Sequence, residues 1–315
     1  MAIDKGASHP QMRRMPDFRL VSPSKSKDLL VAIAFLLPAF AFLGLFVYLP
    51  TILAFLLAFF NYHPGAPTNT FAGLSNLKQA INYSVFQKSM VNTLYYAAMV
   101  VPGTLVLSMA IALLINRVTK IYSFARTLVL MPYVTPAIGT AIGWLWIYNP
   151  SYGLANAVLH VFHIPASQWM ASPYMAMPAV AIYSLWHGIG FDVIILITAI
   201  SGLPSGVLEA AIVDGASAWT KFWRVTLPLL SPTVFFITVV TTIGSFQAFS
   251  QIFALSTGSG GPEYATTTTI FLIYQTAFEY GDFSYAAAMA IYLVLGIFLL
   301  TMLMRWIGKR AVFYQ

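Results

Sequence analysis

Residues Glu209–Pro232 read EAAIVDGASAWTKFWRVTLPLLSP, a polar stretch of 24 residues between two apolar runs. The stretch contains helix starts, a turn dipeptide and charged side chains. A helix that crosses a bilayer needs about 20 predominantly apolar residues, and this stretch does not supply them. We therefore expect it to lie outside the membrane and to form a contact surface.

The composition around this stretch is that of a membrane protein. The 315 residues are 59% hydrophobic and 8% charged, and their mean hydropathy is +0.78. A soluble domain carries roughly 25% charged residues. Cysteine is absent, which excludes disulfides and thiolate chemistry. The composition therefore predicts an integral membrane protein.

Six apolar segments predict six transmembrane helices and hence an all-α fold. They cover residues 29–60, 89–116, 127–148, 178–200, 233–255 and 285–304. The first segment is too long for one straight crossing. We expect it to leave the bilayer near Pro50 and to continue as an outer extension.

Basic residues predict the orientation, because cytoplasmic loops carry an excess of Lys and Arg. With the N-terminus inside, 14 basic residues lie inside and 2 lie outside. The inside set is Lys5, Arg13, Arg14, Arg19, Lys25, Lys27, Arg117, Lys120, Arg126, Lys221, Arg224, Arg305, Lys309 and Arg310, and the outside set is Lys78 and Lys88. Both termini and the Glu209–Pro232 stretch are therefore predicted to be cytoplasmic. The net charge of +7 is mainly a topology signal, and nucleic-acid binding is not expected.

The predicted organisation is one membrane domain with short polar ends. Residues 1–28 form a basic cytoplasmic tail, and residues 311–315 form a cytoplasmic C-terminus. The apolar run after the tail is longer than the core of a cleaved signal peptide, so we expect a retained first helix. The transmembrane domain covers residues 29–310, has its core at 89–308, and includes the cytoplasmic loop 204–232.

Three outer segments, residues 61–88, 149–177 and 256–284, separate the spans. In the second, apolar residues at helical spacing over Leu154–Phe162 predict a short helix on the membrane surface. In the third, Ser259-Gly260-Gly261-Pro262 is a strong turn signal.

The cytoplasmic loop is predicted to contain two short helices. Pro204-Ser205 ends the fourth span and offers an N-cap for a helix over Ser205–Val213. Asp214-Gly215 is a turn dipeptide, since Gly tolerates positive φ and Asp bonds its own backbone. Ser217 can then cap a second helix, which Pro228 would end or kink.

Side chains in this loop suit a docking surface. Trp219, Phe222 and Trp223 share one helix face by their spacing, and small residues lie at the junction of the two helices. Such a pair of helices can fit a protein groove. The alternative is an ordinary loop between spans with an interfacial aromatic belt.

The exact residues favour the docking surface. The pattern E-A-A-x-x-D-G-A-x(5)-F-x(4)-L-P-x(3)-P strongly resembles the cytoplasmic loop of binding-protein-dependent ABC import permeases. It is present without departure as Glu209, Ala210, Ala211, Asp214, Gly215, Ala216, Phe222, Leu227, Pro228 and Pro232. The resemblance implies the ABC type I importer permease fold, with both termini inside.

A second patch is similar to the carbohydrate-type permeases of that family. It comprises Thr257–Pro262, Thr266–Thr269, Ile273-Tyr274, Ala277-Phe278, Tyr280-Gly281 and Ala286–Ala288. Within that group the chain resembles the maltose-type and glycerol-3-phosphate-type permeases, and its ending Val312–Gln315 looks like the latter. The resemblance covers about residues 28–315.

The resemblance implies a coupling role for the loop, which in that family docks into a groove on a cytoplasmic ATPase. The positions that match are Glu209, Ala210, Ala211, Asp214, Gly215 and Ala216. Their chemistry agrees: Gly215 permits the turn, the alanines permit close approach, and Glu209 can reach a basic partner. For Asp214, a cap at the helix end and a direct contact both stay open.

The partners that the resemblance implies are a second homologous permease, two ABC ATPase subunits and an extracytoplasmic solute-binding protein. They would act on a small solute, in the lipid of a bacterial or archaeal inner membrane. The chain has no G-x-x-x-x-G-K-[ST] phosphate loop, so ATP and Mg would bind on the ATPase subunits and no cofactor is expected in this chain. With no catalytic constellation in the sequence, an enzyme is not expected. His160 and His163 have a spacing that a metal could use, but we interpret them as residues of the surface helix and expect no metal site.

Polar residues inside spans are costly and often functional, and they predict the solute path. Asp192 is the only acidic residue within a predicted span, and it is either functional or a structural partner of a backbone group or another subunit. The fifth span carries an unusually polar set: Thr241, Thr242, Ser245, Gln247, Ser250 and Gln251. Similarity to the maltose-type permease places solute contacts near Gly188, Phe191, Gly244 and Gln247.

The solute class can be weighed from the spans. No Lys or Arg lies in the middle of a span, whereas aromatics, hydroxyls and amides suit a neutral sugar or oligosaccharide. Glycerol-3-phosphate stays open, because a paired permease could supply a cation. A different class, an ion-coupled secondary transporter, would use Asp192 or His187 as its coupling group.

Overall fold

The computed structural model describes residues 25–62, 65, 70–116 and 120–311, and the chain divides into two units, Met1–Leu53 and Ala54–Gln315. The first unit is helical where it is described. It contains α1 (Lys25–Leu43), the π-helical turn η1 (Gly44–Tyr48) and the first residues of α2 (Leu49–Leu57). The basic tail, residues 1–28, lies almost wholly outside the described residues, as does the C-terminal ending 312–315.

Helical backbone runs from Leu29 to Leu57, and this helix is long and apolar enough to cross a bilayer. Pro50 is the second residue of α2, which follows directly on η1. A wider π turn is a common way of absorbing a residue that breaks the hydrogen-bond ladder. The helix therefore continues through Pro50, and the expected first span ends at Leu57 rather than at residue 60. That it leaves the bilayer near Pro50 stays a prediction.

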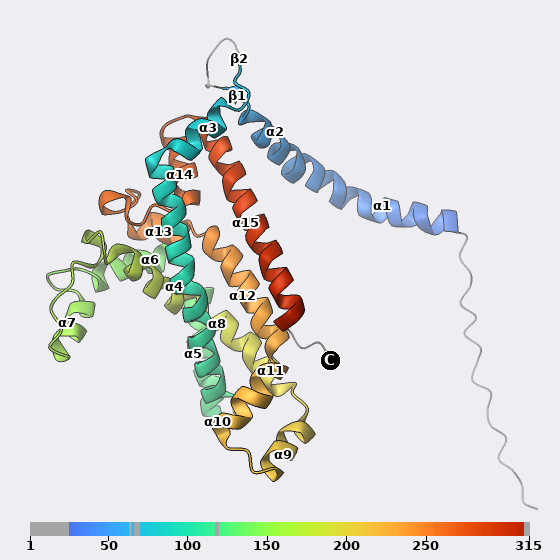
Figure 1. The fold of residues 1–315 in the computed structure, drawn as a ribbon, viewed down its shortest axis with the longest axis vertical. Coiled ribbons are helices and arrows are strands. Elements are labelled where there is room, and N and C mark those ends of the chain that lie inside the picture. Colours follow the sequence, from blue (N-terminus) through green and yellow to red (C-terminus); the bar gives the residue numbers. More distant parts are fainter. Residues whose placement is uncertain (1–24, 63–64, 66–69, 117–119, 312–315) are drawn as a thin grey trace, which may run out of the picture. The chain divides into compact units, whose positions relative to one another are not determined.

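The second unit is a bundle of helices with one small hairpin (Figure 1). Its elements are β1 (Phe60–Asn61), β2 (Thr70–Phe71), α3 (Ser75–Asn82), α4 (Ser84–Ile115), α5 (Lys120–Val134), α6 (Ala137–Ile147), α7 (Leu154–Val161), η2 (Trp169–Ala171), α8 (Ala176–Ser201), α9 (Ser205–Val213), α10 (Ala218–Lys221), η3 (Phe222–Thr226), α11 (Leu227–Leu229), α12 (Ser231–Phe246), α13 (Ser250–Leu255), η4 (Pro262–Tyr264), α14 (Thr269–Tyr274), η5 (Gln275–Glu279) and α15 (Phe283–Ala311). The hairpin is antiparallel and pairs Phe60 with Phe71.

Helix α4 runs through the middle of this unit and packs against α8, α12 and α14. Helix α5 lies along α8, and α15 packs on α3, α12 and α14. The short helix predicted over Leu154–Phe162 is present as α7, and its position on the membrane surface stays a prediction. The predicted turn at Ser259–Pro262 contains two glycines, Gly260 and Gly261, both with φ of +76°.

The helices that could cross a membrane are compatible with the six spans expected, provided that each bent pair counts as one span. Among the described residues, four helices are long and apolar enough to cross a bilayer, and two further pairs of helices pass the same test if each bent pair is one span. The four are Leu29–Leu57, Ser84–Ile115, Ala176–Ser201 and Phe283–Lys309; the pairs are Tyr122–Val134 with Ala137–Ile147, and Ala218–Leu229 with Ser231–Phe246.

The third apolar segment, residues 127–148, is not the continuous helix that the sequence predicts. It breaks between α5 and α6, whose axes differ by 98°. The break lies at Thr135-Pro136, where proline lacks an N–H and disfavours helical backbone in the residue before it.

The fifth segment, residues 233–255, is also interrupted. Helix α12 ends at Phe246, and the chain turns before α13 begins at Ser250. The freed carbonyl of Ala248 accepts a hydrogen bond from the Thr268 hydroxyl at 3.3 Å. The buried threonine run therefore satisfies backbone that the broken helix leaves open.

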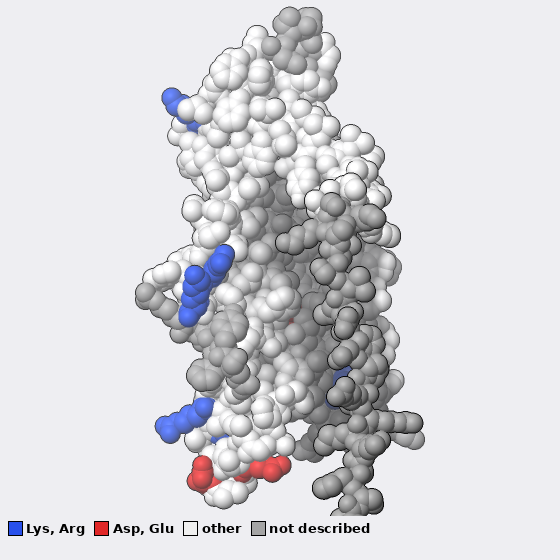
Figure 2. Space-filling view, turned by 90° about the vertical axis from the view of Figure 1, so that its right-hand side faces the viewer, with Lys and Arg blue, Asp and Glu red and all other residues white. Residues whose placement is uncertain are grey.

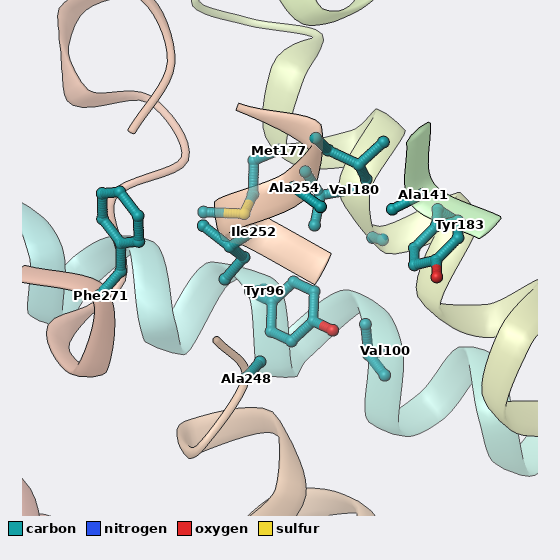
Figure 3. Packing of buried hydrophobic residues seen from close by; sticks show 12 residues of the cluster. Tyr96, Val100, Ala141, Met177, Val180, Tyr183, Ala248, Ile252, Ala254 and Phe271 are labelled. Atoms are coloured by element: carbon teal, nitrogen blue, oxygen red, sulfur yellow. The ribbon is translucent and has the colours of Figure 1, made fainter. Parts of the chain in front are cut away.

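A hydrophobic cluster packs α6 and α13, the helices that follow the two breaks, against α4, α8 and α14. Figure 3 shows Tyr96 and Val100 of α4 beside residues of α6, α8, α13 and α14, among them Ile252 and Phe271, which are both fully buried. Because α6 and α13 follow the two breaks and also pack on each other, the cluster fixes where both bent segments lie. The fold thus places short, bent helices around the middle of the long helices α4 and α8.

Candidate coupling surface and solute cavity

Helix α9 ends in a hydrogen-bonded turn that the sequence of the loop encodes. The N–H of Ala216 donates to the carbonyl of Ala211 at 3.0 Å, and the N–H of Gly215 donates to that of Ile212 at 3.0 Å. These two bonds are the Schellman motif, which needs a left-handed residue after the helix. Gly215 supplies it with φ of +74°.

The caps of the two loop helices differ from one another. Ser217 caps the second helix as expected, since its hydroxyl accepts from the N–H of Thr220 at 3.2 Å. The expectation that Ser205 caps α9 is wrong: Pro204 holds the cap position with extended backbone, and Ser205 is the first helical residue. Asp214 follows Val213, the last residue of α9, and holds the C-cap position. Its backbone N–H donates to the carbonyl of Ala210 at 2.9 Å.

The second loop helix is a continuous rod made of α10, η3 and α11, and it meets α12 at an angle of 68° just after Pro228. Its aromatic residues cluster as predicted, with ring centroids 5.5 Å apart for Trp219 and Trp223 and 5.2 Å apart for Phe222 and Trp223. Together with Leu105 and Met109 of α4, they line an apolar groove of about 630 Å³. The aromatic face therefore borders a groove beside α4, with Trp219 and Trp223 largely exposed, and α9 is the outermost part of the loop.

The predicted coupling residues all lie on or next to α9. Glu209, Ala210, Asp214 and Gly215 are exposed, whereas Ala211 and Ala216 are half-buried at the turn. Figure 2 shows acidic side chains gathered at the end of the molecule where Figure 1 places α9. The loop thus presents a compact helix with two acidic residues and small neighbours.

An open cavity of about 410 Å³ lies between α4, α5, α6, α8, α12 and α13. Its lining comprises Tyr96, Val100, Thr104, Tyr133, Ala137, Tyr183, Ser184, His187, Gly188, Phe191, Asp192, Val240, Thr241, Gly244, Ser245, Ser250 and Gln251. The lining mixes aromatic rings with hydroxyl, amide and carboxylate groups, and this mixture is typical of sites that bind polar small molecules.

Four of the five predicted solute-path residues line this cavity: Gly188, Phe191, Asp192 and Gly244. Gln247 does not; it is the exposed residue that ends α12, while Gln251 on α13 faces the cavity instead. The difference arises because the break after Phe246 changes the direction of the chain. The apolar pattern of residues 233–255 predicts one continuous helix and contains no sign of this change in chain direction.

Two sets of contacts between lining residues were not expected from the sequence. Tyr96 donates its hydroxyl to Ser184 at 2.8 Å and accepts from the Gln251 amide at 3.1 Å, which joins α4, α8 and α13. The rings of Tyr133 and Phe191 stack at 5.2 Å and form an aromatic face. Gln251 carried a signal as one of the polar residues of the fifth span, and Phe191 was a predicted solute-path residue, whereas nothing in the sequence pointed to Tyr96 or Tyr133.

Two side chains of α8 stabilise the break between α5 and α6. The hydroxyl of Tyr183 donates to the carbonyl of Ala137 at 2.6 Å, and Nε2 of His187 lies 3.2 Å from the carbonyl oxygen of Thr135. Backbone freed by a broken helix at membrane depth must be hydrogen-bonded within the protein. His187 therefore holds the bend, which argues against a role as a mobile proton carrier.

A known protein family matches residues 104–312, from the middle of α4 to just beyond α15, and its description is binding-protein-dependent transport system inner membrane component. The chain belongs to this family of ABC transporter permeases. The match includes both the α9 surface and most of the cavity lining. Membership favours an ATP-driven permease over the ion-coupled transporter considered above.

Individual relatives agree with this assignment. The permease is 32% identical over 255 residues to the sn-glycerol-3-phosphate transport system permease protein UgpA of Yersinia pestis, covering 80% of this chain and 85% of the relative. It is 29% identical over 275 residues to the trehalose/maltose transport system permease protein MalF of Thermococcus litoralis, covering 87% and 92%.

The fold also agrees with solved structures. Two crystal structures of a bacterial alginate ABC transporter align with a TM-score of 0.75, each covering 90% of this chain and 96% of theirs, at 23% and 22% identity. The all-α fold of a type I importer permease is thereby confirmed.

Proposed function

We propose that this chain is the permease subunit of an ABC importer that carries a sugar or oligosaccharide across the cytoplasmic membrane of a bacterium or archaeon. The described cavity is one half of the path, and a second, related permease supplies the other half. The chain itself performs no catalysis. ATP and Mg²⁺ bind on two ATPase subunits, and an extracytoplasmic binding protein delivers the solute.

The observation that carries this proposal is the connection between the exposed helix α9 and the cavity. Helix α8, which carries Asp192, leads directly into α9, and the rod that follows α9 leads into α12, which carries Gly244. A partner that grips α9 is therefore attached to both walls of the cavity. Movement of the ATPases during ATP binding and hydrolysis can in this way alternate the access of the cavity between the two sides.

The proposed solute class rests on the cavity and on the relatives. Relatives are named for trehalose and maltose and for sn-glycerol-3-phosphate, and the structural neighbour imports the acidic polysaccharide alginate. The lining described above contains neither Lys nor Arg, although a phosphate or carboxylate favours a cation in its site. An uncharged sugar therefore fits this half of the path better than glycerol-3-phosphate.

A binding protein as the donor of solute is supported by one solved neighbour, which was crystallised with a periplasmic protein bound to an alginate pentasaccharide. Family membership supports the same arrangement for this permease. Genes for a second permease and a binding protein beside this one would support the proposed assembly.

The coupling role is tested by replacing Glu209 with alanine in the complete transporter, reconstituted in proteoliposomes. Truncating one member of a buried charge pair at an interface costs 2–5 kcal/mol, so we expect stimulation of ATPase activity by the loaded binding protein to fall at least about tenfold. Ser205→Ala on the same helix is the matched control, because Ser205 is exposed and does not cap α9. Normal stimulation in Glu209→Ala, with normal assembly, would overturn the coupling role.

A further inference from the structure

Asp192 has an unusual position in the cavity wall. Its side chain is only 8% exposed, yet it lines the open cavity. In the described part of the chain, no hydrogen-bond donor and no cationic side chain lies within bonding distance of its carboxylate. Asp192 is therefore more than nine-tenths buried as a residue, has no partner among the described residues, and borders the open cavity.

The charges around Asp192 leave it uncompensated. The Lys and Arg side chains that the structure describes lie on helices, and none of them lines the cavity. Carboxylates at membrane depth are expensive and usually face a cavity or a partner group. Electrostatic interactions are stronger in such a low-dielectric site than in water, so an ionised Asp192 would make this cavity unfavourable for an anionic solute.

The groups next to Asp192 suit a sugar ring. Phe191, the preceding residue, is 39% exposed and stacks on Tyr133, which gives a flat aromatic face. Hydroxyl and amide groups of Ser184 and Gln251 lie on the same cavity wall. A sugar placed on the aromatic face would offer hydroxyl donors to a carboxylate acceptor, and bonds from a hydroxyl to an ionised oxygen are about twice as strong as neutral ones.

We propose that Asp192 accepts hydrogen bonds from solute hydroxyl groups and makes the permease select uncharged sugars over sugar acids and sugar phosphates. The inference rests on the proposed function and names the charge class of its solute. An anionic solute would lose these hydrogen bonds and meet a negative charge of the same sign. Selection by charge would then take place in the membrane path, in addition to any selection by the binding protein.

The experiment compares two trisaccharides of similar size, neutral maltotriose and anionic trigalacturonate. Their binding to the assembled transporter of permeases and ATPases, in nanodiscs without binding protein, is measured by titration calorimetry. We expect the wild-type transporter to bind maltotriose at least about tenfold more tightly than trigalacturonate, a difference of about 1.4 kcal/mol. In Asp192→Asn, which keeps size and polarity but removes the charge, this preference should fall by about tenfold. Glu263→Gln is the matched control, because Glu263 is an exposed acidic residue outside the cavity.

The outcomes separate the two proposals. If Asp192→Asn assembles normally and keeps the wild-type preference, the role of Asp192 is overturned while the sugar assignment stands. If the wild type binds neither trisaccharide, the sugar assignment is overturned and the role of Asp192 with it. If Asp192→Asn does not assemble, the wild-type measurement still decides, since equal affinity for both trisaccharides overturns the inference.

Discussion

Nε2 of His187 on α8 lies 3.2 Å from the carbonyl oxygen of Thr135, the last residue before the bend between α5 and α6. Four residues earlier on α8, Tyr183 bonds the carbonyl of Ala137 just after the bend. The spacing of four residues places both donors on the same helix face. One face of α8 thus supplies hydrogen bonds to both sides of a broken span.

Replacing His187 with alanine should destabilise the folded transporter. The Thr135 carbonyl would lose its donor at membrane depth, and an unsatisfied buried group costs about 1–3 kcal/mol. The measurement is the melting temperature of the purified complex in detergent. His187→Gln, which retains an N–H donor, should recover most of the loss. A melting temperature that is unchanged in His187→Ala would show that this hydrogen bond contributes nothing to the bend.

Replacing Gly190 with alanine should separate α5 from α8. A Cβ at position 190 would lie 2.3 Å from the carbonyl oxygen of Val129, closer than real Cβ contacts allow. Forcing extra atoms into a packed contact costs typically 1–3 kcal/mol. Gly188→Ala is the matched control for stability, since a Cβ there meets nothing within 4 Å. Equal melting temperatures for the two variants would contradict the close packing.

Gly215 should tolerate asparagine better than alanine. Its φ of +74° is left-handed, which costs an ordinary L-residue roughly 1–2 kcal/mol but is more accessible to asparagine. In Gly215→Ala the turn after α9 is therefore strained, and binding-protein-stimulated ATPase activity should fall while basal ATPase activity stays. The prediction fails if Gly215→Asn is impaired as much as Gly215→Ala.

Gln251 should matter more for solute uptake than Gln247. Gln251 lines the cavity and donates to Tyr96, whereas Gln247 is exposed outside it. One hydrogen bond contributes about 0.5–1.5 kcal/mol of free energy. Its loss in Gln251→Ala should therefore raise the KM of uptake about three- to tenfold. Uptake kinetics in proteoliposomes measure both variants side by side. A larger effect from Gln247→Ala would place the solute elsewhere, for example against the second permease.

The sequence determined the parts of this protein that depend on local chemistry and on the bilayer. Long apolar runs predict α4, α8 and α15 because a helix is the one way to bury backbone in lipid within a single segment. The turn at Gly215 and the cap at Ser217 follow from the properties of single residues. The family pattern of the loop predicts α9 as the coupling surface. Three of the predicted residues that line the cavity, Gly188, Phe191 and Gly244, followed from the same resemblance, and Asp192 followed from its charge within a predicted span.

Tertiary structure decided where the broken segments go. Pro136 interrupts the helix between α5 and α6. The 98° bend is stabilised because Tyr183 and His187, about 50 residues away in the sequence, form hydrogen bonds with the backbone that the bend exposes. Likewise, the turn after Phe246 places Gln251 at the cavity and Gln247 outside it. In this turn the carbonyl of Ala248 accepts a hydrogen bond from the Thr268 hydroxyl. Helical spacing along one segment contains no information about such distant donors. The sequence could therefore indicate polar residues within the spans, whereas the packing of α6, α8 and α13 decided which of them face the cavity.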